Sequence, residues 1–349
     1  MSIAARGAKG AGEKRESFWS SRPMRRLRRN KLAWVGAVLV LAFMLVAVFA
    51  PLIAPPPKVG NNCLRDLGQS EPSAVYNPAG GAFWRMILAP PASCYQITRI
   101  NFQPQPSPPL QTIQTEAGPV VPLLGTASGY DMWYGIIWGT RTAFKLAITV
   151  VFFQLLIGIT LGAISGYFGG TVDNLIQRFI EIILSFPGLV LVIVITAILG
   201  PSLGNIMAAF IAVGWAGYAR IVRGDVLKVR ALEFVDGARA LGVSDLRLIF
   251  RHIIPNALTT ITAIAVLDLG ALPLAAAGLS FLGIGLPVGF ADWGQLVSFA
   301  RAWIQGNTES RLAYWYVAFY PALTIILFGL GWNLLGSAVR DAVDPRDNG

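Results

Sequence analysis

Six long apolar stretches dominate the hydrophobic pattern of this chain, and polar segments separate them. A helix that crosses a bilayer needs about 20 mostly apolar residues, because the hydrocarbon layer is about 30 Å thick and a helix rises about 1.5 Å per residue. The fifth stretch is long enough to be tilted or broken by Pro255 and Pro273. The pattern predicts an all-α polytopic membrane protein with six transmembrane helices, at residues 32–53, 146–168, 179–199, 203–222, 253–284 and 314–337.

The composition agrees with a membrane protein, because 54% of the residues are hydrophobic and only 13% are charged. The charge is unevenly placed. Residues 1–31 hold ten Lys and Arg against two Glu, which is +8 of the net charge of +10. Positive flanks of a first span resist translocation. We therefore expect a basic cytoplasmic tail at 1–31, next to a first transmembrane helix at 32–54, that meets anionic lipid rather than nucleic acid.

The other charged segments predict the orientation of the chain. Six crossings from a cytoplasmic start return the carboxyl-terminal tail, 340–349, to the cytoplasm. Residues 220–251 carry seven basic side chains against four acidic ones, as a cytoplasmic loop does, whereas 286–311 is balanced and suits the outside. Arg141 and Lys145 lie at the predicted outer mouth of the second span, where we expect them to snorkel or to line an aqueous vestibule.

The segment between the first two spans, 55–122, holds 13 of the 22 prolines of the chain. We expect a Pro-rich extracytoplasmic insert without a large core of its own. Both cysteines of the chain, Cys63 and Cys94, lie in this insert. An oxidising compartment favours a disulfide between them, and two unpaired thiols are the alternative.

The sequence argues against a zinc-type cluster, a Ser/His/Asp triad and a P-loop. His252 is the only histidine and no cysteine lies outside the insert, so a zinc-type cluster cannot form. A Ser/His/Asp triad would need the same histidine. None of the six lysines is followed by Ser or Thr, as in a P-loop. We therefore expect no catalytic residue, no metal and no cofactor bound by this chain.

The polar loop between the fourth and fifth spans, 230–255, has the pattern of two short helices joined by a sharp turn. The first helix is amphipathic, with one apolar face formed by Phe234, Ala238 and Leu241. Gly242 supplies a left-handed stop, and Ser244 caps the next helix. Such an element lies outside the bilayer but is continuous with two spans, so it can turn a push from a cytoplasmic partner into a tilt of those spans. An ordinary surface loop is the alternative.

This loop resembles the EAA motif of ABC-importer permeases, in which Glu, two small residues and Gly, then Ile and Pro, mark the coupling helix that docks into a groove on the ATPase subunit. The matching positions are Glu233, Gly237, Ala238, Gly242, Ile254 and Pro255. Gly237 stands where the motif usually has Ala, which should loosen that helix slightly. The resemblance assigns ATPase coupling to this loop, including its apolar residues Phe234 and Leu241.

The resemblance covers nearly all of 32–54 and 123–346, and it is to the second permease of dipeptide and oligopeptide importers in the peptide/nickel family. The segments that carry it are 166–170 followed by Asp173, 178–187, 279–285, Trp293 with Gly294, 333–336 and 340–346. The resemblance implies a type I ABC-importer permease architecture with its permease core at 123–339.

Departures from the family pattern fall on the translocation side. The family's Leu-Gly-Thr-Asp run reads Leu-Gly-Thr-Ala at 124–127, and Ala276 replaces an acidic residue. Asp268 is the only acid deep in a predicted span, where an ionised carboxylate must face water, find a partner or stay protonated. We assign Asp268 and Arg141 to the translocation path. A structural hydrogen bond from Asp268 to a neighbouring helix or to the sister permease is the alternative.

The resemblance implies a transmembrane permease subunit of an ATP-driven importer of peptides or related small solutes in a prokaryotic plasma (inner) membrane. Its implied partners are a homologous second permease, two ATPase subunits that bind ATP and Mg, and an extracytoplasmic solute-binding protein. ATPase activity belongs to those partners, so this chain is not expected to be an enzyme. The alternative is a self-sufficient secondary transporter or channel, which inverted repeats and paired intramembrane charges would favour. The solute, whether dipeptide, oligopeptide, nickel or glutathione, stays open, because specificity in such systems rests largely with the binding protein.

Overall fold

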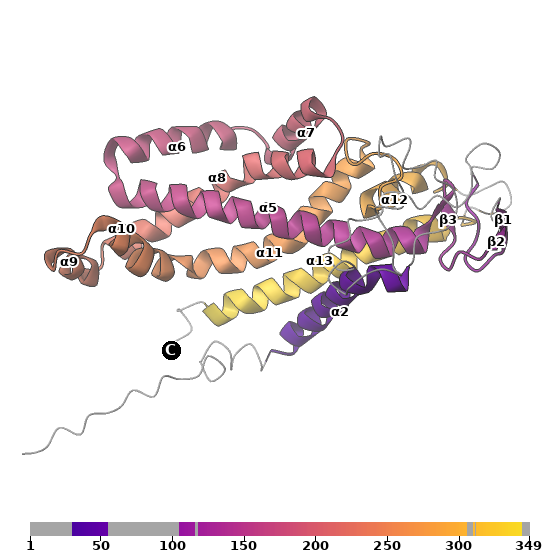
Figure 1. The fold of residues 1–349 in the computed structure, drawn as a ribbon, viewed down its shortest axis with the longest axis horizontal. Helices are drawn as coiled ribbons and strands as arrows, with labels where there is room; N and C mark the ends of the chain where they lie inside the picture. The colour runs from indigo at the N-terminus through magenta and orange to yellow at the C-terminus, as the bar shows by residue number, and fades with distance from the viewer. Residues whose placement is uncertain (1–29, 55–104, 116–117, 306–309, 311, 344–349) are drawn as a thin grey trace, which may run out of the picture.

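A computed structural model gives the structure of the chain and describes residues 30–54, 105–115, 118–305, 310 and 312–343 (Figure 1). In these ranges five helices are long and apolar enough to cross a membrane, and a bent pair of shorter helices makes a sixth candidate span. The five are α2 (Lys31–Ile53), α5 (Met132–Phe168), α8 (Leu203–Arg230), α11 (Ile254–Phe281) and α13 (Trp315–Val343). The all-α polytopic fold is as predicted. The tail at 1–29, both cysteines and residues 344–349 lie outside the described residues.

The helices form three layers that run along the long axis of the molecule (Figure 1). α2 packs against α13 on one side, and α6 (Gly170–Leu184) and α7 (Gly188–Leu199) pack against α8 on the other. α5, α8 and α11 lie between them. One end of the molecule, here called the α9 end, carries α9 (Glu233–Ala240); the opposite end carries the β-hairpins.

Three glycines let α5 and α8 touch backbone to backbone. Gly158, Gly162 and Gly166 are spaced four residues apart, so they lie on one face of α5. A Cβ added at Gly158 would come within 2.5 Å of Tyr218 Cβ, and one at Gly162 within 2.5 Å of the Ala219 carbonyl oxygen. Membrane helices associate through such close packing, because lipid supplies no hydrophobic force between them. The α5–α8 contact is also the most extensive helix contact of the described residues.

Among the spans that form one continuous helix, the largest shifts from the predicted bounds are at the start of α5 and the end of α8. α5 begins at Met132, 14 residues before the predicted start at 146, and Asp131 caps it by accepting hydrogen bonds from the backbone N–H groups of Trp133 and Tyr134. The extra turns carry Arg141, which the sequence had placed at a mouth outside the helix. α8 continues to Arg230, past the predicted end at 222, because its last two turns still bury Val226 and Val229.

The third predicted span, 179–199, is wrong as a single helix. α6 and α7 meet at an angle of 82° across the break at Ser185, Phe186 and Pro187. Proline has no N–H to donate and its ring collides with the preceding turn, so the helix ends there. By contrast, α11 runs unbroken through Pro273, and Pro255 sits in its first turn, where the missing N–H costs nothing. Of the two alternatives for the fifth span, tilted or broken, a break at either proline is therefore absent.

The end opposite α9 is held by hydrogen bonds between segments distant in sequence. The Trp138 indole donates to the carbonyl oxygen of Ala54 at 2.8 Å, and the Trp293 indole donates to that of Ile136 at 3.0 Å. The elements at this end are the antiparallel pairs β1 (Ile113–Thr115) with β2 (Gly118–Val120) and β3 (Thr126–Ala127) with β4 (Tyr130–Asp131), then α12 (Trp293–Phe299) and η5 (Ala300–Ala302).

Replacing Gly162 by Val should destabilise the protein, because the new side chain meets a backbone oxygen that can move only if α5 and α8 separate. Overpacking of this kind costs about 1–3 kcal/mol. Thermal unfolding of the detergent-purified protein measures the loss. Gly217→Val in α8 is the matched control, since a Cβ there meets nothing within 4 Å. Equal losses for the two variants would contradict the close contact.

Candidate functional site

A helix, a sharp turn and a second helix form the tip of the α9 end, as the sequence predicted for 230–255. α9 is followed by Gly242 in a left-handed conformation with φ of +79°, and then by α10 (Asp245–Leu248) and the π-helical turn η4 (Ile249–Ile253) that leads into α11. The N–H of Gly242 donates to Arg239 O at 3.0 Å, and that of Val243 to Ala238 O at 3.2 Å. These bonds satisfy the last carbonyls of α9.

The inner face of α9 is anchored in the core. Val235 is fully buried and belongs to a cluster with residues of α8 and of the segment that leads into α11, including Val226, Leu248 and Ile253. Around this anchor, large apolar side chains are exposed at Leu232, Phe234, Leu241, Leu246 and Phe250. Exposed apolar groups gathered at one place mark an interaction surface.

One aromatic ring joins the α9 element to the helices behind it. The Tyr167 hydroxyl, at the end of α5, donates a hydrogen bond to the Asp245 carboxylate on α10. The guanidinium carbons of Arg230 and Arg239 lie 5.9 and 6.0 Å from the centre of the same ring. Because Arg239 belongs to α9 and Arg230 to α8, four elements meet at Tyr167. Tyr167 therefore links α9 and α10 to α5 and α8.

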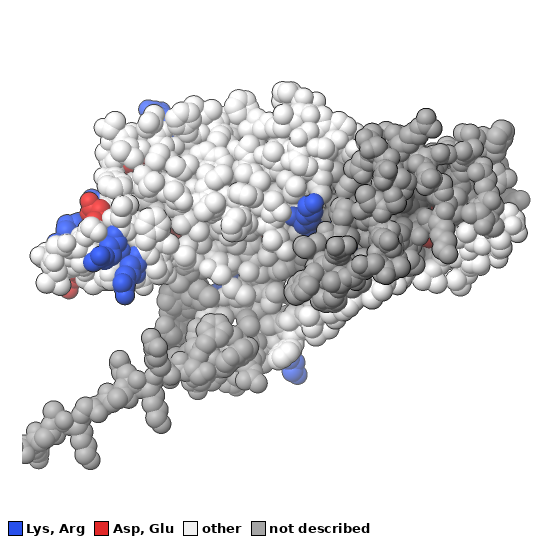
Figure 2. Space-filling model, in the orientation of Figure 1, with Lys and Arg blue, Asp and Glu red and all other residues white. Residues whose placement is uncertain are grey.

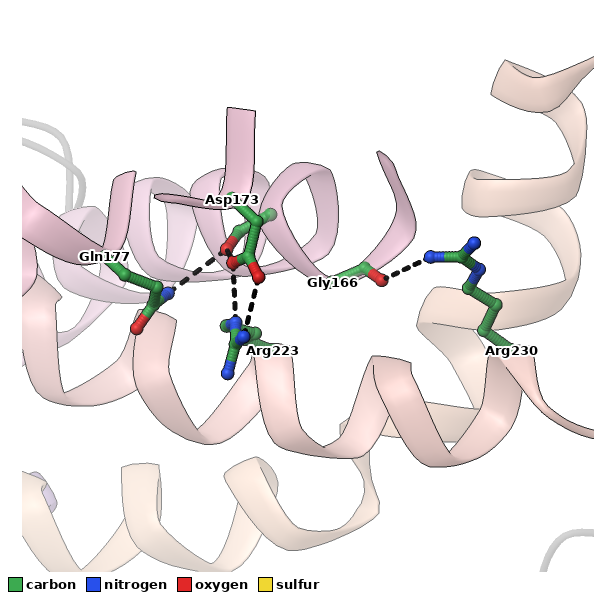
Figure 3. A network of polar contacts seen from close by, with 6 residues as sticks. Gly166, Asp173, Gln177, Arg223 and Arg230 are labelled. Atoms are coloured by element: carbon green, nitrogen blue, oxygen red, sulfur yellow. Dashed lines mark hydrogen bonds and ion pairs between the residues drawn. The ribbon is translucent and has the colours of Figure 1, made fainter. Parts of the chain in front are cut away.

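A second polar junction ties α6 to α5 and α8 (Figure 3). The Arg223 guanidinium of α8 makes two hydrogen bonds of 2.6 Å to the two oxygens of the Asp173 carboxylate in the first turn of α6. Ser165 of α5 also donates to Asp173, and Gln177 donates to Ser165 Oγ at 3.1 Å. Nearby, Arg230 donates to the carbonyl oxygen of Gly166 at 3.4 Å. The junction fixes the position from which α6 begins.

The residues predicted for coupling all lie at this end, and all but Pro255 belong to α9 or to the turn that follows it. Glu233 is exposed in the first turn of α9, and Gly237 and Ala238 follow in the same helix. Phe234 is partly exposed, and Leu241 is 86% exposed at the turn. Pro255 lies further on, in the first turn of α11 behind η4.

The two residues predicted for the translocation path lie apart from this element. Asp268 is half-buried in α11 and accepts a hydrogen bond from the Tyr218 hydroxyl of α8. The Arg141 guanidinium carbon lies 5.3 Å from the centre of the Trp138 ring, within α5. Asp268 thus has a partner on the neighbouring helix, which is the alternative that the sequence left open.

Two carboxyl groups near the hairpin end are buried as helix caps. Burial raises the pKa of Asp131 to about 6, although two backbone N–H groups donate to it. Burial also raises the pKa of Asp292, which accepts from Ser280 and caps α12. In the described part of the chain, no group of three or more His, Cys, Asp or Glu side chains is placed to hold a metal ion.

Sequence reasoning missed four residues of these junctions as contributors: Tyr167, Arg223, Tyr218 and Asp245. Their contacts span 50 residues or more of sequence, from Tyr218 to Asp268 and from Tyr167 to Asp245. A single sequence carries no signal for such a pairing. The one sign in the sequence was that Tyr167, in the last turn of α5, and Asp173, in the first turn of α6, belong to the segments that carried the resemblance.

Comparisons with known proteins agree on one family. Residues 158–347 match the family described as binding-protein-dependent transport system inner membrane component, and residues 17–69 match the N-terminal TM domain of oligopeptide transport permease C. A dipeptide transport system permease protein of Alkalihalophilus pseudofirmus is 34% identical over 92% of this chain and 88% of its own length. An oligopeptide transport system permease protein of Haemophilus influenzae is 38% identical over 63% of this chain and 69% of its own. A glutathione transport system permease protein of Pectobacterium atrosepticum is 34% identical over 62% and 70%.

Proposed function

This chain belongs to the family of binding-protein-dependent transport system inner membrane components, and we propose that partner ATPases dock on its α9 helix and move it. The chain is the transmembrane permease subunit of an ABC importer of peptides. In the proposed arrangement two ATPase subunits bind ATP and Mg, a homologous second permease supplies the other half of the pathway, and an extracytoplasmic binding protein delivers the solute. This chain supplies no catalytic group.

The observation that carries the proposal is the form of the α9 element. It projects beyond the spans, it is anchored through Val235, and it exposes apolar side chains such as Phe234 and Leu241. Apolar groups held rigidly on a projecting helix suit insertion into a groove on another protein. The carboxylate of Glu233 in the first turn of α9 also complements the positive end of the helix dipole.

The distribution of charge supports a cytoplasmic position for the α9 end in a prokaryotic inner membrane. On the face shown in Figure 2, the largest group of Lys and Arg side chains lies at this end. Lys228, Arg230 and Arg239 belong to α8 and α9 here. Basic segments next to a span stay on the cytoplasmic side. With six crossings, both termini then lie in the cytoplasm, and the hairpins face the binding protein.

The proposed transmission runs through the two polar junctions. When ATP closes the ATPases around α9, Arg239 and the α10 residue Asp245 pull on the Tyr167 ring, and hence on the end of α5. Ser165, two residues earlier, holds Asp173 and with it the start of α6. The close α5–α8 contact makes these helices move together. Such movement favours one of two states, open inward or open outward.

The relatives support a peptide-like solute. Their names give dipeptide, oligopeptide and glutathione as the solutes of those proteins. Peptides share an ammonium group and a carboxylate at their ends. We place Asp268 at the wall of the path, where its carboxylate meets the solute ammonium group while Tyr218 holds it in position. Arg141 lies on the same route towards the hairpin end.

Affinity purification of the tagged subunit in mild detergent tests the proposed assembly. Two ATPase subunits and a second, homologous permease should co-purify in fixed stoichiometry, as identified by mass spectrometry. A subunit that purifies alone and transports solute along an ion gradient in vesicles would be a secondary transporter, and the proposal would be wrong.

Gly242→Ala should uncouple transport from ATP hydrolysis. Its φ of +79° lies in the left-handed region, where an L side chain costs about 1–2 kcal/mol, so the turn after α9 must rearrange. We expect solute uptake to fall about tenfold for a distortion of about 1.4 kcal/mol. The measurement is uptake per ATP hydrolysed by the purified complex in vesicles.

Gly237→Ala is the control for this prediction. Gly237 lies within α9, a Cβ there meets nothing within 4 Å, and Ala favours a helix. Uptake by this variant should be normal. Glu233→Ala, which removes the charge but keeps the turn, should also lower uptake. Normal solute-stimulated ATPase activity and normal uptake in assembled Gly242→Ala complexes would show that α9 does not couple ATP hydrolysis to transport.

Asp268→Asn separates a role in the path from a role in packing. The amide keeps the shape and still accepts the Tyr218 hydrogen bond, but it loses the charge. Uptake of peptides with a free amino terminus should fall about tenfold, the loss of one interaction worth about 1.4 kcal/mol, and blocked peptides should be much less affected. Tyr218→Phe, which removes the hydrogen bond alone, is the companion variant. Equal losses for both peptide classes, or failure to assemble, would assign Asp268 to packing.

A further inference from the structure

One face of α6 carries polar side chains that the described part of the subunit leaves uncovered. Positions three and four apart on a helix share a face, so the pattern i, i+3, i+7, i+10 runs along one side. On α6 and its C-cap this side holds Thr171, Asn174, Arg178, Glu181 and Ser185, here called the α6 polar stripe. All five are exposed. The opposite side of α6 packs on α8 through Ile176, Ile180 and Ile183.

The stripe reaches well into the apolar part of the molecule. Asp173 marks the α9 end of α6 by its bond to Arg223, and Glu181 lies eight residues further, about 12 Å along the axis. At this depth Ile180 packs against Ala216 and Ala219 of α8. The side chains of Arg178 and Glu181 are 80% and 57% exposed, and Nη1 of Arg178 lies 3.6 Å from Oε2 of Glu181. An acid and a base therefore project together from a membrane helix.

The helices of the layer on the other side of the molecule, α2 and α13, carry no such pair of charges in their apolar parts. α2 from 32 to 53 and α13 from 315 to 339 contain no Asp, Glu, Lys or Arg, as suits helices that face lipid. Charged side chains inside a membrane protein face its interior or a water-filled cavity, because exposure to lipid is costly. Snorkelling to the bilayer surface accounts for a long side chain such as Arg178. It does not account for Glu181, which is shorter and lies one turn deeper.

We propose that the α6 polar stripe lines the water-filled path of the assembled importer and binds the two charged ends of a passing zwitterionic solute. This rests on the proposed function, in which the subunit forms half of a pathway. The Arg178 guanidinium suits a carboxylate, and the Glu181 carboxylate suits an ammonium group. Both charges are held on one rigid helix, and neither is buried, so each interaction is weak enough for the solute to leave.

Cysteine labelling in the assembled complex tests the position of the stripe. In a background with Cys63 and Cys94 replaced by Ser, Asn174→Cys and Ser185→Cys should react with a charged, membrane-impermeant methanethiosulfonate. The matched controls are Leu175→Cys and Ile182→Cys, because these residues are each 60% exposed in the subunit but lie beside the stripe. The stripe positions should react at least about tenfold faster, since the reagent needs water around the thiol.

The charge of the reagent tests the chemistry of the stripe. Glu181→Gln in the Ser185→Cys protein should lower the rate with a cationic reagent relative to an anionic one by roughly twofold to fivefold. Arg178→Gln in the Asn174→Cys protein should shift that ratio in the opposite direction. Unchanged ratios would mean that the two charges do not act on the path.

Two other outcomes would overturn the proposal. Equal reaction rates at the stripe and control positions would mean that the α6 polar stripe is no more exposed to water than the apolar side chains beside it. Protection of the stripe in the complex, but reaction in the isolated subunit, means that the second permease covers it. Neither outcome depends on whether ATPases co-purify or α9 couples transport, so a failure of the proposed function remains distinguishable.

Discussion

The backbone contact between α5 and α8 is the constraint on which the rest of the structure depends. In water, burial of apolar surface would hold two such helices together, but lipid offers no such gain, so the helices must approach closely enough for dispersion and polar contacts to hold them. Gly158 and Gly162 remove the side chains that would keep them apart. Deeper in the same contact, the Gln154 amide donates to the carbonyl oxygen of Phe210 at 2.7 Å. The elements that pack on α5 or α8 are therefore positioned by this rigid pair.

The polar junctions lie where the α5–α8 pair meets α6, α9 and α10. Tyr167 lies at the last turn of α5, next to the glycine run, and it contacts α8, α9 and α10 at once. Asp173 fixes the beginning of α6 to the same two helices. In the apolar part of the α5–α8 contact, by contrast, close packing is the main interaction that holds the two helices together. In the proposed mechanism, a displacement of α9 therefore acts on the whole α5–α8 pair.

The sequence was sufficient for five spanning helices in their order and for the helix–turn–helix form of the α9 element, because each depends on local pattern. The apolar run from 203 is long enough for a span, and Gly242 is followed by residues that restart a helix, so both were predictable. The start of α5 was not. Arg141 and Lys145 interrupt the hydropathy, yet the turns before them are buried at Trp138 and Ile137 by segments far away in sequence. The α6–α7 bend was missed because an apolar run hides a break at Pro187.

The side-chain pairs at the site could not be predicted from the sequence, for a different physical reason. Tyr218 and Asp268 lie 50 residues apart, and their hydrogen bond exists only because α8 and α11 pack side by side. The polar face of α6 shows the reverse case. Its spacing is readable in the sequence, but its meaning depends on where the buried face lies, and only the contact of Ile180 with α8 reveals that. A helix with one face packed on its own subunit, one apolar face and one charged face suits a boundary between protein, lipid and water, which is the place that the proposed path gives to α6.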